Sequence, residues 1–515
     1  MNKILTLSIN AILCLSSTIA LSATPKHGHS VLSAPNPTGT PIPIRQPFQE
    51  PDEAGAGTID LVVAPKIFTY NDKDYALRTY NGKLVGPTMR ITPGQTLNVN
   101  LTNNLSSKFS TDEKTNLHTH GLHASPKAPQ DNPLAVIQPD GGTSGDYYHI
   151  VVPTNQWTGT QWYHPHWHGN TAIQVANGMT GALIVEDDPA KLPQSLKDAK
   201  EKVFVFQQIL VDNAIGQPLK ARITANGKAI STDGIPVLIN GQSQPVLTMQ
   251  PGEVQRWRFI DGDGTFHQLN LVLEGHDLHE IALDGMYTGT IDTWKAASQI
   301  GQSSQAVVLN SGNRSDVLIQ AQACGKPECT YKLIDQASAD DETDQILATL
   351  VVKGDTKPMT LPTAAEMAAL KSQVDIPTTD APATQTVTLM VGADVCNNGG
   401  KDCVDGVTWN KEETPRSMPI GEVQKWKVSV NKFSHPFHIH VNPFQTTRNG
   451  PDGNPEIVWL DTVLVSPDKP VELYIRNENV LGAPIADGVS VLHCHILAHE
   501  DAGMMQSIKF NAPVK

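Results

Sequence analysis

The feature that most constrains this 515-residue chain is a short segment that occurs three times. Residues 252–259 read GEVQRWRF, residues 421–428 read GEVQKWKV, and residues 93–100 read PGQTLNVN, a looser copy. The copies lie a domain length apart, far more than the roughly 20 to 50 residues of a solenoid repeat. Each combines a glycine turn with an alternating strand. The repeat therefore predicts three related β domains, which also suits the chain length.

The composition favours the same fold class. The chain has 39 Gly and 37 Pro but only 5% aromatic residues, as expected for short strands joined by many turns. We therefore predict an all-β protein with no long amphipathic helix and one short helical patch at residues 364–371. The net charge of −14 argues against nucleic acid or an anionic membrane as a partner, because both require a basic face.

Residues 1–23 resemble an export signal. Lys3 is followed by a mostly apolar stretch up to Ala20, and small residues that a signal peptidase could cleave come next. An uncleaved anchor is the alternative, but the apolar core is short for a membrane span. We expect a periplasmic or secreted protein with no membrane span in its mature form.

The repeat and the changes in local composition give candidate domain boundaries. We expect a signal peptide (1–23), a flexible segment (24–58), domain 1 (59–188), domain 2 (189–355), a linker (356–384) and domain 3 (385–515).

The cysteines fall into two couples and one remainder, apart from Cys14 in the signal. In an oxidising compartment each couple could close a small loop, although the sequence alone does not prove the pairing. The couples are Cys324 with Cys329 and Cys396 with Cys403. Cys494 is left over, and it lies between two histidines.

Most of the 18 histidines occur in four motifs in domains 1 and 3. These are His118-Thr119-His120, His164-Pro165-His166, His435-Pro436-Phe437-His438-Ile439-His440, and His493-Cys494-His495 followed by His499. Residues two apart on a strand share a face, so each His-x-His pair places two imidazoles side by side. A single pair is often a surface accident, but four pairs predict one metal cluster held between two domains.

The last motif predicts a second site behind the first. His493 and His495 face one way along the strand, and Cys494 faces the other. One thiolate, two imidazoles and a weak thioether describe a blue-copper electron-transfer centre, which His435, His499 and Met504 could complete. Zinc is the alternative, but structural zinc sites usually use several cysteines.

These motifs, in this order, resemble the copper-binding signature of the multicopper oxidases from about residue 61 to residue 510. The resemblance implies three cupredoxin-like Greek-key β-sandwiches and four copper ions, with a domain 2 that binds no copper and acts as a spacer and support. It implies His435, Cys494 and His499 as type 1 copper ligands with Met504 axial, and His118 and His438 at the type 2 copper. It assigns the type 3 pair to His120, His164, His166, His440, His493 and His495.

The resemblance also implies a mechanism. Four one-electron oxidations at the type 1 site would supply electrons, through Cys494 to His493 and His495, for reduction of dioxygen to water. This reaction consumes protons, so a carboxylate near the cluster should deliver them. Glu500, beside His499, is the first candidate, and Asp131 is the second. For each, a purely structural hydrogen bond is the competing interpretation.

The sequence says less about the electron donor. Many relatives are laccase-like and oxidise phenols and aromatic amines at an exposed type 1 histidine, whereas others oxidise cuprous or ferrous ions. The copper-efflux branch has a methionine-rich insertion, but the linker here holds only Met359 and Met367, and residues 431–434 approach His435 without a methionine. We therefore favour a laccase-like activity over metal oxidation, in a protein that we expect to be a monomer.

The alternative outside the enzymes is a cupredoxin-fold protein without catalytic activity, such as a scaffold or a copper store. Such a protein should lack several ligands, and this chain lacks none. A zinc-dependent hydrolase fits less well still.

Overall fold

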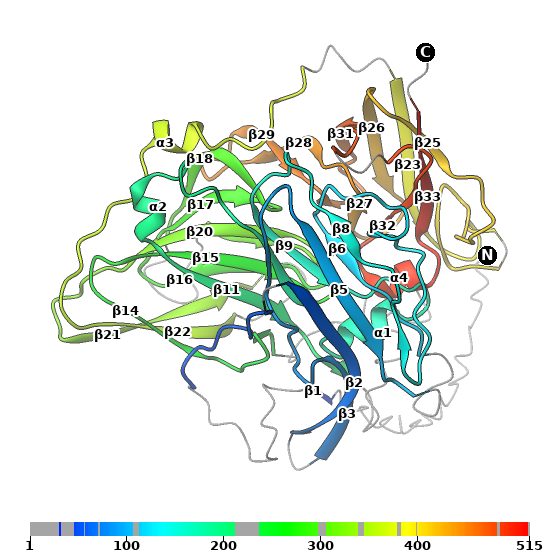
Figure 1. Ribbon diagram of the computed structural model, residues 1–515. Coiled ribbons are helices and arrows are strands. Elements are labelled where there is room, and N and C mark those ends of the chain that lie inside the picture. Colours follow the sequence, from blue (N-terminus) through cyan, green and yellow to red (C-terminus); the bar gives the residue numbers. More distant parts are fainter. Residues whose placement is uncertain are drawn as a thin grey trace, which may run out of the picture.

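The computed structural model describes residues 30–31, 46–55, 57–70, 73–106, 113–211, 236–296, 305–337, 344–377, 383–397, 399–481 and 485–512. The predicted signal peptide lies outside the described residues. Strands dominate the described part and form three two-sheet sandwiches, which confirms the predicted fold class (Figure 1). The exact domain boundaries stay predictions.

Domain 1 contains one sheet in the order β3-β2-β5-β7, with β8 also paired to β5, and a second sheet in the order β4-β10-β9-β6. The strands of the first sheet are β2 (Thr58–Tyr70), β3 (Lys73–Tyr80), β5 (Thr96–Asn103), β7 (Gly142–Thr143) and β8 (His149–Val151). Those of the second are β4 (Met89–Ile91), β6 (His118–His120), β9 (Gly159–His164) and β10 (Gly181–Val185).

Domain 2 has a six-stranded sheet in the order β13-β11-β15-β20-β17-β18 and a five-stranded sheet in the order β14-β22-β21-β16-β19. The larger sheet contains β11 (Lys200–Gln207), β13 (Leu238–Ile239), β15 (Val254–Asp261), β17 (Leu278–Leu283), β18 (Met286–Trp294) and β20 (Arg314–Gln320). The smaller contains β14 (Val246–Met249), β16 (Leu269–Leu273), β19 (Val307–Leu309), β21 (Glu328–Asp335) and β22 (Gln345–Lys353).

Domain 3 has a six-stranded sheet in the order β24-β23-β26-β31-β28-β29 and a five-stranded sheet in the order β25-β33-β32-β27-β30. The larger sheet contains β23 (Ala383–Val391), β24 (Asp402–Val404), β26 (Val423–Val430), β28 (Phe444–Asn449), β29 (Pro455–Leu460) and β31 (Val471–Arg476). The smaller contains β25 (Arg416–Pro419), β27 (His435–Ile439), β30 (Thr462–Val465), β32 (Val489–Cys494) and β33 (Met505–Asn511). A separate pair joins β1 (Ser30–Val31) to β12 (Leu210–Val211).

The three copies of the repeat become equivalent strands. β5, β15 and β26 each pair in parallel with the first long strand of their domain, namely β2, β11 and β23. The two closer copies share a further contact. The indole N–H groups of Trp257 and Trp426, both fully buried, donate to the side-chain oxygens of Gln255 and Gln424, two residues earlier on the same strand. The repeat therefore specifies the strand around which each sandwich is built.

The described helices are all short: α1 (Thr171–Ala176), α2 (Gln194–Asp198), α3 (Ala364–Ala368) and α4 (Leu497–Asp501). α3 lies within the predicted helical patch and begins with a capping box, in which Thr363 and Glu366 satisfy each other's main-chain N–H groups. None of the described helices is long and apolar enough to cross a membrane.

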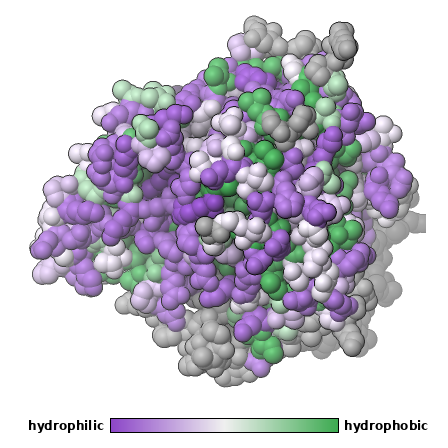
Figure 2. All heavy atoms as spheres, in the orientation of Figure 1, coloured by the Kyte–Doolittle hydropathy of each residue, from purple (hydrophilic) through white to green (hydrophobic). Residues whose placement is uncertain are grey.

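Each sandwich has its own apolar core between its two sheets. On the face shown in Figure 2, hydrophobic residues are scattered among hydrophilic ones. Cys324 pairs with Cys329 and Cys396 with Cys403, as the spacing suggested, while Cys494 is free and buried.

The domains are arranged so that the first and the last meet. In Figure 1 the blue-to-cyan strands of domain 1 lie beside the orange-to-red strands of domain 3, and the green strands of domain 2 lie to the left. α1 of domain 1 contacts α4 of domain 3, and β9 of domain 1 contacts β15 and β20 of domain 2. All three domains therefore approach the region where the histidine motifs lie.

Candidate metal centre

Eight histidines from domains 1 and 3 converge on one buried cluster, and each is at most 4% exposed. Antiparallel pairing aligns them within each domain. His118 on β6 lies opposite His164 on β9, and His438 on β27 lies opposite His493 on β32. His120 is on β6, His440 and His495 directly follow the ends of β27 and β32, and His166 lies two residues beyond the end of β9. The His-x-His motifs thus come together as the strand alternation predicted.

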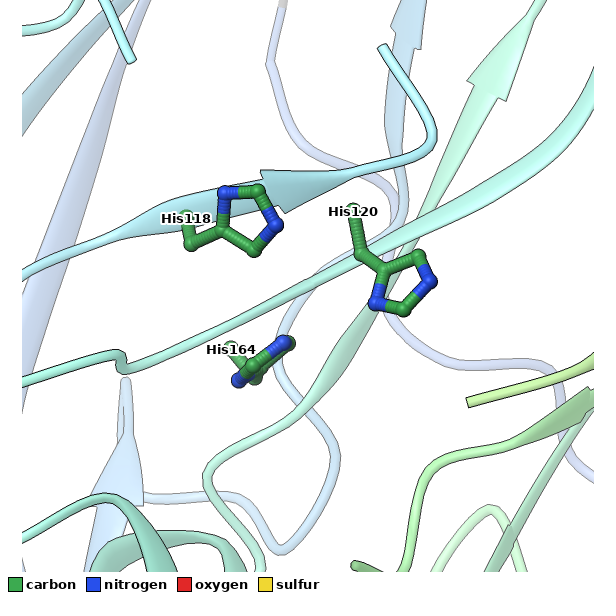
Figure 3. Close-up of side chains that lie close together, drawn as sticks. All are labelled: His118, His120 and His164. Carbon is green, nitrogen blue, oxygen red and sulfur yellow. The ribbon is translucent and has the colours of Figure 1, made fainter. Parts of the chain in front are cut away.

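The two domains meet ring against ring. The imidazole of His118 stacks on that of His440 with centroids 4.1 Å apart, and His120 stacks on His438 at 3.9 Å. Figure 3 shows the domain 1 side, where His118, His120 and His164 surround a common space. The cluster is therefore an interface between the beginning and the end of the chain.

The hydrogen bonding of these histidines leaves their inner nitrogens free. In most of them one ring nitrogen lies within hydrogen-bond distance of a protein acceptor, as between His164 Nδ1 and the Pro165 carbonyl at 2.9 Å. The other nitrogen is buried without a protein partner in His118 (Nε2), His120 (Nδ1), His164 (Nε2), His438 (Nε2) and His495 (Nε2). Unpaired buried nitrogens are rare in folded proteins. Together they fit metal ligation.

Burial also keeps these imidazoles in the form that binds metal. It lowers the pKa of His120, His164, His166, His438, His440, His493 and His495, and the repulsion that protonated neighbours would exert lowers these pKa values further, with Arg314 also acting on His120. A neutral imidazole has the lone pair that a metal requires. The Nε2 atoms of His166 and His493 approach to 3.2 Å, which a shared cation would explain.

The second site lies within domain 3. The Sγ atom of Cys494 is 3.4 Å from His435 Nδ1 and 3.7 Å from His499 Nδ1, and the two nitrogens are 3.3 Å apart. Met504 is fully buried in the same apolar core, and its main chain hydrogen-bonds to Cys494 and His499. One thiolate, two imidazoles and a nearby thioether match the donors of a blue-copper centre.

The thiol of Cys494 is fully buried in an apolar core. Burial raises the pKa of its thiol, although an N–H···S contact from Ile496 opposes this. Binding of a metal would therefore release a proton from Cys494. The rings of Phe433 and Phe266 lie 4.9 Å from His435 and 5.0 Å from His499, so aromatic side chains wall the site.

β32 connects the two sites. Cys494 packs in the domain 3 core, while its neighbours His493 and His495 meet the domain 1 rings of His166 and His120 at 4.9 and 5.1 Å. The structure places adjacent residues on opposite sides of one strand, as the alternation predicted. Thiolate and cluster are therefore joined through the main chain of three consecutive residues.

Comparison with known proteins identifies the family. Family models described as multicopper oxidase match residues 63–190, 211–334 and 375–512, which together cover most of the chain. The chain belongs to the multicopper oxidases. It is therefore a copper oxidoreductase that uses dioxygen, with copper at type 1, type 2 and type 3 sites.

Similar proteins support this placement. A multicopper oxidase of Staphylococcus aureus is 28% identical over 84% of this chain and 83% of its own length. A laccase of Bacillus stratosphericus is 25% identical over 84% of this chain and 90% of its own. The structure of a Campylobacter jejuni multicopper oxidase has the same fold, with a TM-score of 0.70 at 21% identity over 93% of this chain and 98% of that one.

Both predicted acidic residues lie against cluster histidines. The carboxylate of Glu500 on α4 is 3.6 Å from His166 Nδ1 and 3.7 Å from His493 Nδ1. Burial raises the pKa of Glu500, as does the charge of Asp501, while a hydrogen bond from Thr171 opposes them. Glu500 thus contacts one cluster histidine from each of the two domains.

Asp131 contacts a different histidine. Its carboxylate is 3.1 Å from His118 Nδ1 and accepts hydrogen bonds from the main chain and hydroxyl of Thr119. It also borders a small recess that His118 and His438 line. Asp131 therefore orients a ligand that the resemblance assigns to the type 2 copper.

Sequence reasoning missed several residues that complete the site. Asp461 lies 3.0 Å from His120 Nε2, and Ser311 of domain 2 lies 3.0 Å from His495 Nδ1. Phe266, also of domain 2, covers His499. No motif marks any of them, because each is a single residue brought to the site from a remote part of the chain.

Proposed function

We propose that this multicopper oxidase is laccase-like and takes single electrons from phenolic or related aromatic donors to reduce dioxygen to water. The observation that carries the proposal is the completeness of both sites, with all three strong type 1 donors in place directly behind eight converging imidazoles. Bound copper would supply the one-electron chemistry and the reaction with dioxygen that side chains alone cannot provide.

The chain itself provides the connection. An electron that enters at the Cys494 thiolate has only a few covalent bonds to cross before it reaches the imidazoles of His493 and His495. The buried, aromatic-walled pocket keeps water away from the thiolate, while the His118–His440 and His120–His438 stacks hold the cluster in fixed geometry. Side-chain packing thus positions both sites.

Reduction of dioxygen to two waters consumes four electrons and four protons, so the cluster needs an acid. We propose that Glu500 delivers protons, because its carboxyl group contacts histidines of both domains and is itself held by Thr171. We propose that Asp131 mainly holds His118 in place, because one oxygen of its carboxylate, Oδ2, accepts three hydrogen bonds, from His118 and from the main chain and hydroxyl of Thr119.

The surroundings of the type 1 site support an aromatic donor. His435 and His499 are fully buried, unlike the exposed histidine that the laccase comparison led us to expect, because Phe433 and Phe266 cover them. Both phenylalanines are partly exposed. Aromatic donors can pack against such rings, and an edge-to-face or offset contact would be favourable.

The linker methionines give no support for cuprous oxidation. Met367 is fully buried beneath domain 2, and Met359 packs in the same apolar cluster, where its sulfur accepts an N–H group from Val254. Their thioethers are therefore used in packing. Metal oxidation is nevertheless the second candidate, because the Campylobacter jejuni relative is described as a metallo-oxidase.

Oxygen consumption by the copper-loaded protein tests the proposal. We expect a higher kcat/KM with a simple phenol than with a cuprous or a ferrous salt, and no uptake by a Cys494→Ser control. Faster uptake with either metal ion would favour metal oxidation. No uptake with any donor would favour the non-catalytic interpretation.

We further propose that the protein is exported and works in the periplasm or outside the cell, as a monomer. The signal-like residues 1–23 and the two cysteine pairs support this location, because disulfides persist in oxidising compartments. Terminal sequencing of the mature protein should find that it begins near residue 24, and gel filtration should give the mass of one chain.

A further inference from the structure

The turn between β19 and β20 brings domain 2 into contact with the histidine cluster. Ser311 is 1% exposed, and Gly312 has a φ of +94°, a conformation that side chains other than glycine rarely adopt. A Cβ atom at Gly312 would lie 3.0 Å from the ring of His495. Domain 2 therefore packs directly on a histidine that the resemblance assigns to the type 3 pair.

The hydroxyl group of Ser311 determines which nitrogen of His495 carries the proton. Its Oγ lies 2.9 Å from the carbonyl oxygen of His495 and 3.0 Å from Nδ1 of the same residue. A carbonyl only accepts, so the single hydroxyl hydrogen is donated there and the oxygen accepts from Nδ1–H. The lone pair of His495 is then on Nε2, which is buried and has no protein partner.

Arg314, three residues later, acts on a histidine of domain 1 through a residue of domain 3. Its guanidinium donates to both carboxylate oxygens of Asp461, at 2.8 and 2.6 Å, and all of its own surface is buried. Asp461 in turn lies 3.0 Å from His120 Nε2. An ionised carboxylate only accepts, so Nε2 carries the hydrogen and the lone pair is on Nδ1.

The free nitrogen agrees with this assignment. Among the cluster histidines with an unpartnered buried nitrogen, His120 is the one in which that atom is Nδ1. In His118, His164, His438 and His495 it is Nε2. Arg314 also donates to Gln161 Oε1 of domain 1 at 2.6 Å. One fully buried side chain thus joins all three domains at the point where the orientation of His120 is decided.

We propose that domain 2, although it supplies no copper ligand, fixes the tautomers of two type 3 ligands: Ser311 for His495, and Arg314, through Asp461, for His120. Both are positioning residues. A histidine bound to metal usually donates its other N–H group to an outer acceptor, and loss of that acceptor weakens metal binding by about 10- to 100-fold. The inference depends on the ligand assignment but not on the identity of the electron donor.

The first test compares two serine-to-alanine substitutions in the same segment of domain 2. We expect Ser311→Ala to lose copper to a chelator at about 10- to 100-fold lower chelator concentration than the parent, with its blue absorbance retained. Ser315→Ala is the matched control, because that hydroxyl is equally buried but bonds to Glu280 instead of a histidine. We expect it to keep its copper.

Equal copper retention by Ser311→Ala and the parent would overturn the proposal, as would equal loss from Ser315→Ala. Melting temperatures of the two variants, measured before copper loading, separate positioning from folding. If the melting temperature falls in Ser311→Ala but not in Ser315→Ala, and the fall is large enough to account for the loss of copper, the serine acts only on stability. None of these measurements needs an electron donor, so they stand apart from the test of laccase-like activity.

The second test addresses Arg314. Lysine keeps the charge but cannot bond both oxygens of a carboxylate at once, so we expect Arg314→Lys to weaken copper retention by about 10-fold. Arg78→Lys is the control, because Arg78 forms a similarly buried two-bond pair with Glu113, away from the histidine cluster. Equal copper retention in both variants would remove Arg314 from the proposal.

Discussion

The two metal sites of this multicopper oxidase lie back to back, but their surroundings differ. Around Cys494 the neighbours are apolar, including Met504 and the rings of Phe266 and Phe433. Around the histidine cluster the neighbours are hydrogen-bonding groups, such as Glu500 and Asp461. In an apolar pocket, few polar groups have to move when the charge of a bound metal changes. A cluster whose chemistry consumes protons needs acids nearby and histidines with fixed tautomers. The difference is consistent with electron entry at Cys494, on the side of β32 that faces the domain 3 core, and with proton-coupled chemistry at the histidine cluster, on the side that faces domain 1.

Cys494→Ser should have the largest effect. A hydroxyl cannot replace the polarisable thiolate, so we expect the blue colour and the oxygen uptake to fall to background. Copper bound by the cluster should remain, because its ligands lie on the other face of the strand. Metal analysis with absorption spectra checks both points, and a blue, active variant would contradict the assignment of the thiolate site.

Glu500→Gln should affect only the proton-handling side. The amide has nearly the same shape but does not deliver a proton, so we expect oxygen uptake to fall roughly 100-fold while the blue absorbance stays. Glu253→Gln is the control, because it makes the same change at a buried carboxylate that accepts a hydrogen bond from the main chain of Gln250 and does not bond to a histidine. Unchanged oxygen uptake in Glu500→Gln would remove it from the mechanism.

Asp131→Ala should have a smaller and more local effect. Loss of the acceptor of His118 should weaken copper binding at the type 2 position by about 10-fold and leave the type 1 site unchanged. Copper titration followed by electron paramagnetic resonance measures this. The exposed Asp188→Ala is the control, and a similar result for the two variants would show that Asp131 does not orient His118.

Phe433→Ala should have the smallest effect, on the electron-entry side alone. If an aromatic donor packs on this ring, we expect KM for a phenol to rise roughly three- to tenfold. Uptake with a small inorganic donor such as ferrocyanide should change little, which makes it the internal control. A loss of activity with both donors would instead mean that the ring maintains the site.

Much of this arrangement could be predicted from local patterns. The repeated segment predicted the three sandwiches because each copy encodes a glycine turn followed by a strand. In the two most similar copies, residues 252–259 and 421–428, the strand also carries a buried tryptophan. The His-x-His spacing predicted the cluster because strand alternation is a local rule. The burial of His435 and His499 was not predicted, because Phe266 comes from a different domain.

The outer acceptors also could not be predicted. Asp461 precedes an ordinary strand, Ser311 lies in the turn before β20, and Arg314 is the first residue of β20, in the domain to which the resemblance assigns no ligands. Their roles follow from packing between domains, which no spacing in the sequence expresses. Domain 2 was expected to be a spacer, and the contacts of Ser311 and Arg314 add a more specific role.

The division of the cluster between domains 1 and 3 has a consequence for maturation. His118 and His120 are made long before His493 and His495, so the shared cavity does not exist until β32 has been made and domain 3 has packed against domain 1. The thiolate pocket, by contrast, needs domain 3 for all its ligands. Copper acquisition by the shared cavity is therefore a late event, and a chain truncated before β32 would lack both centres, however well its first two domains fold.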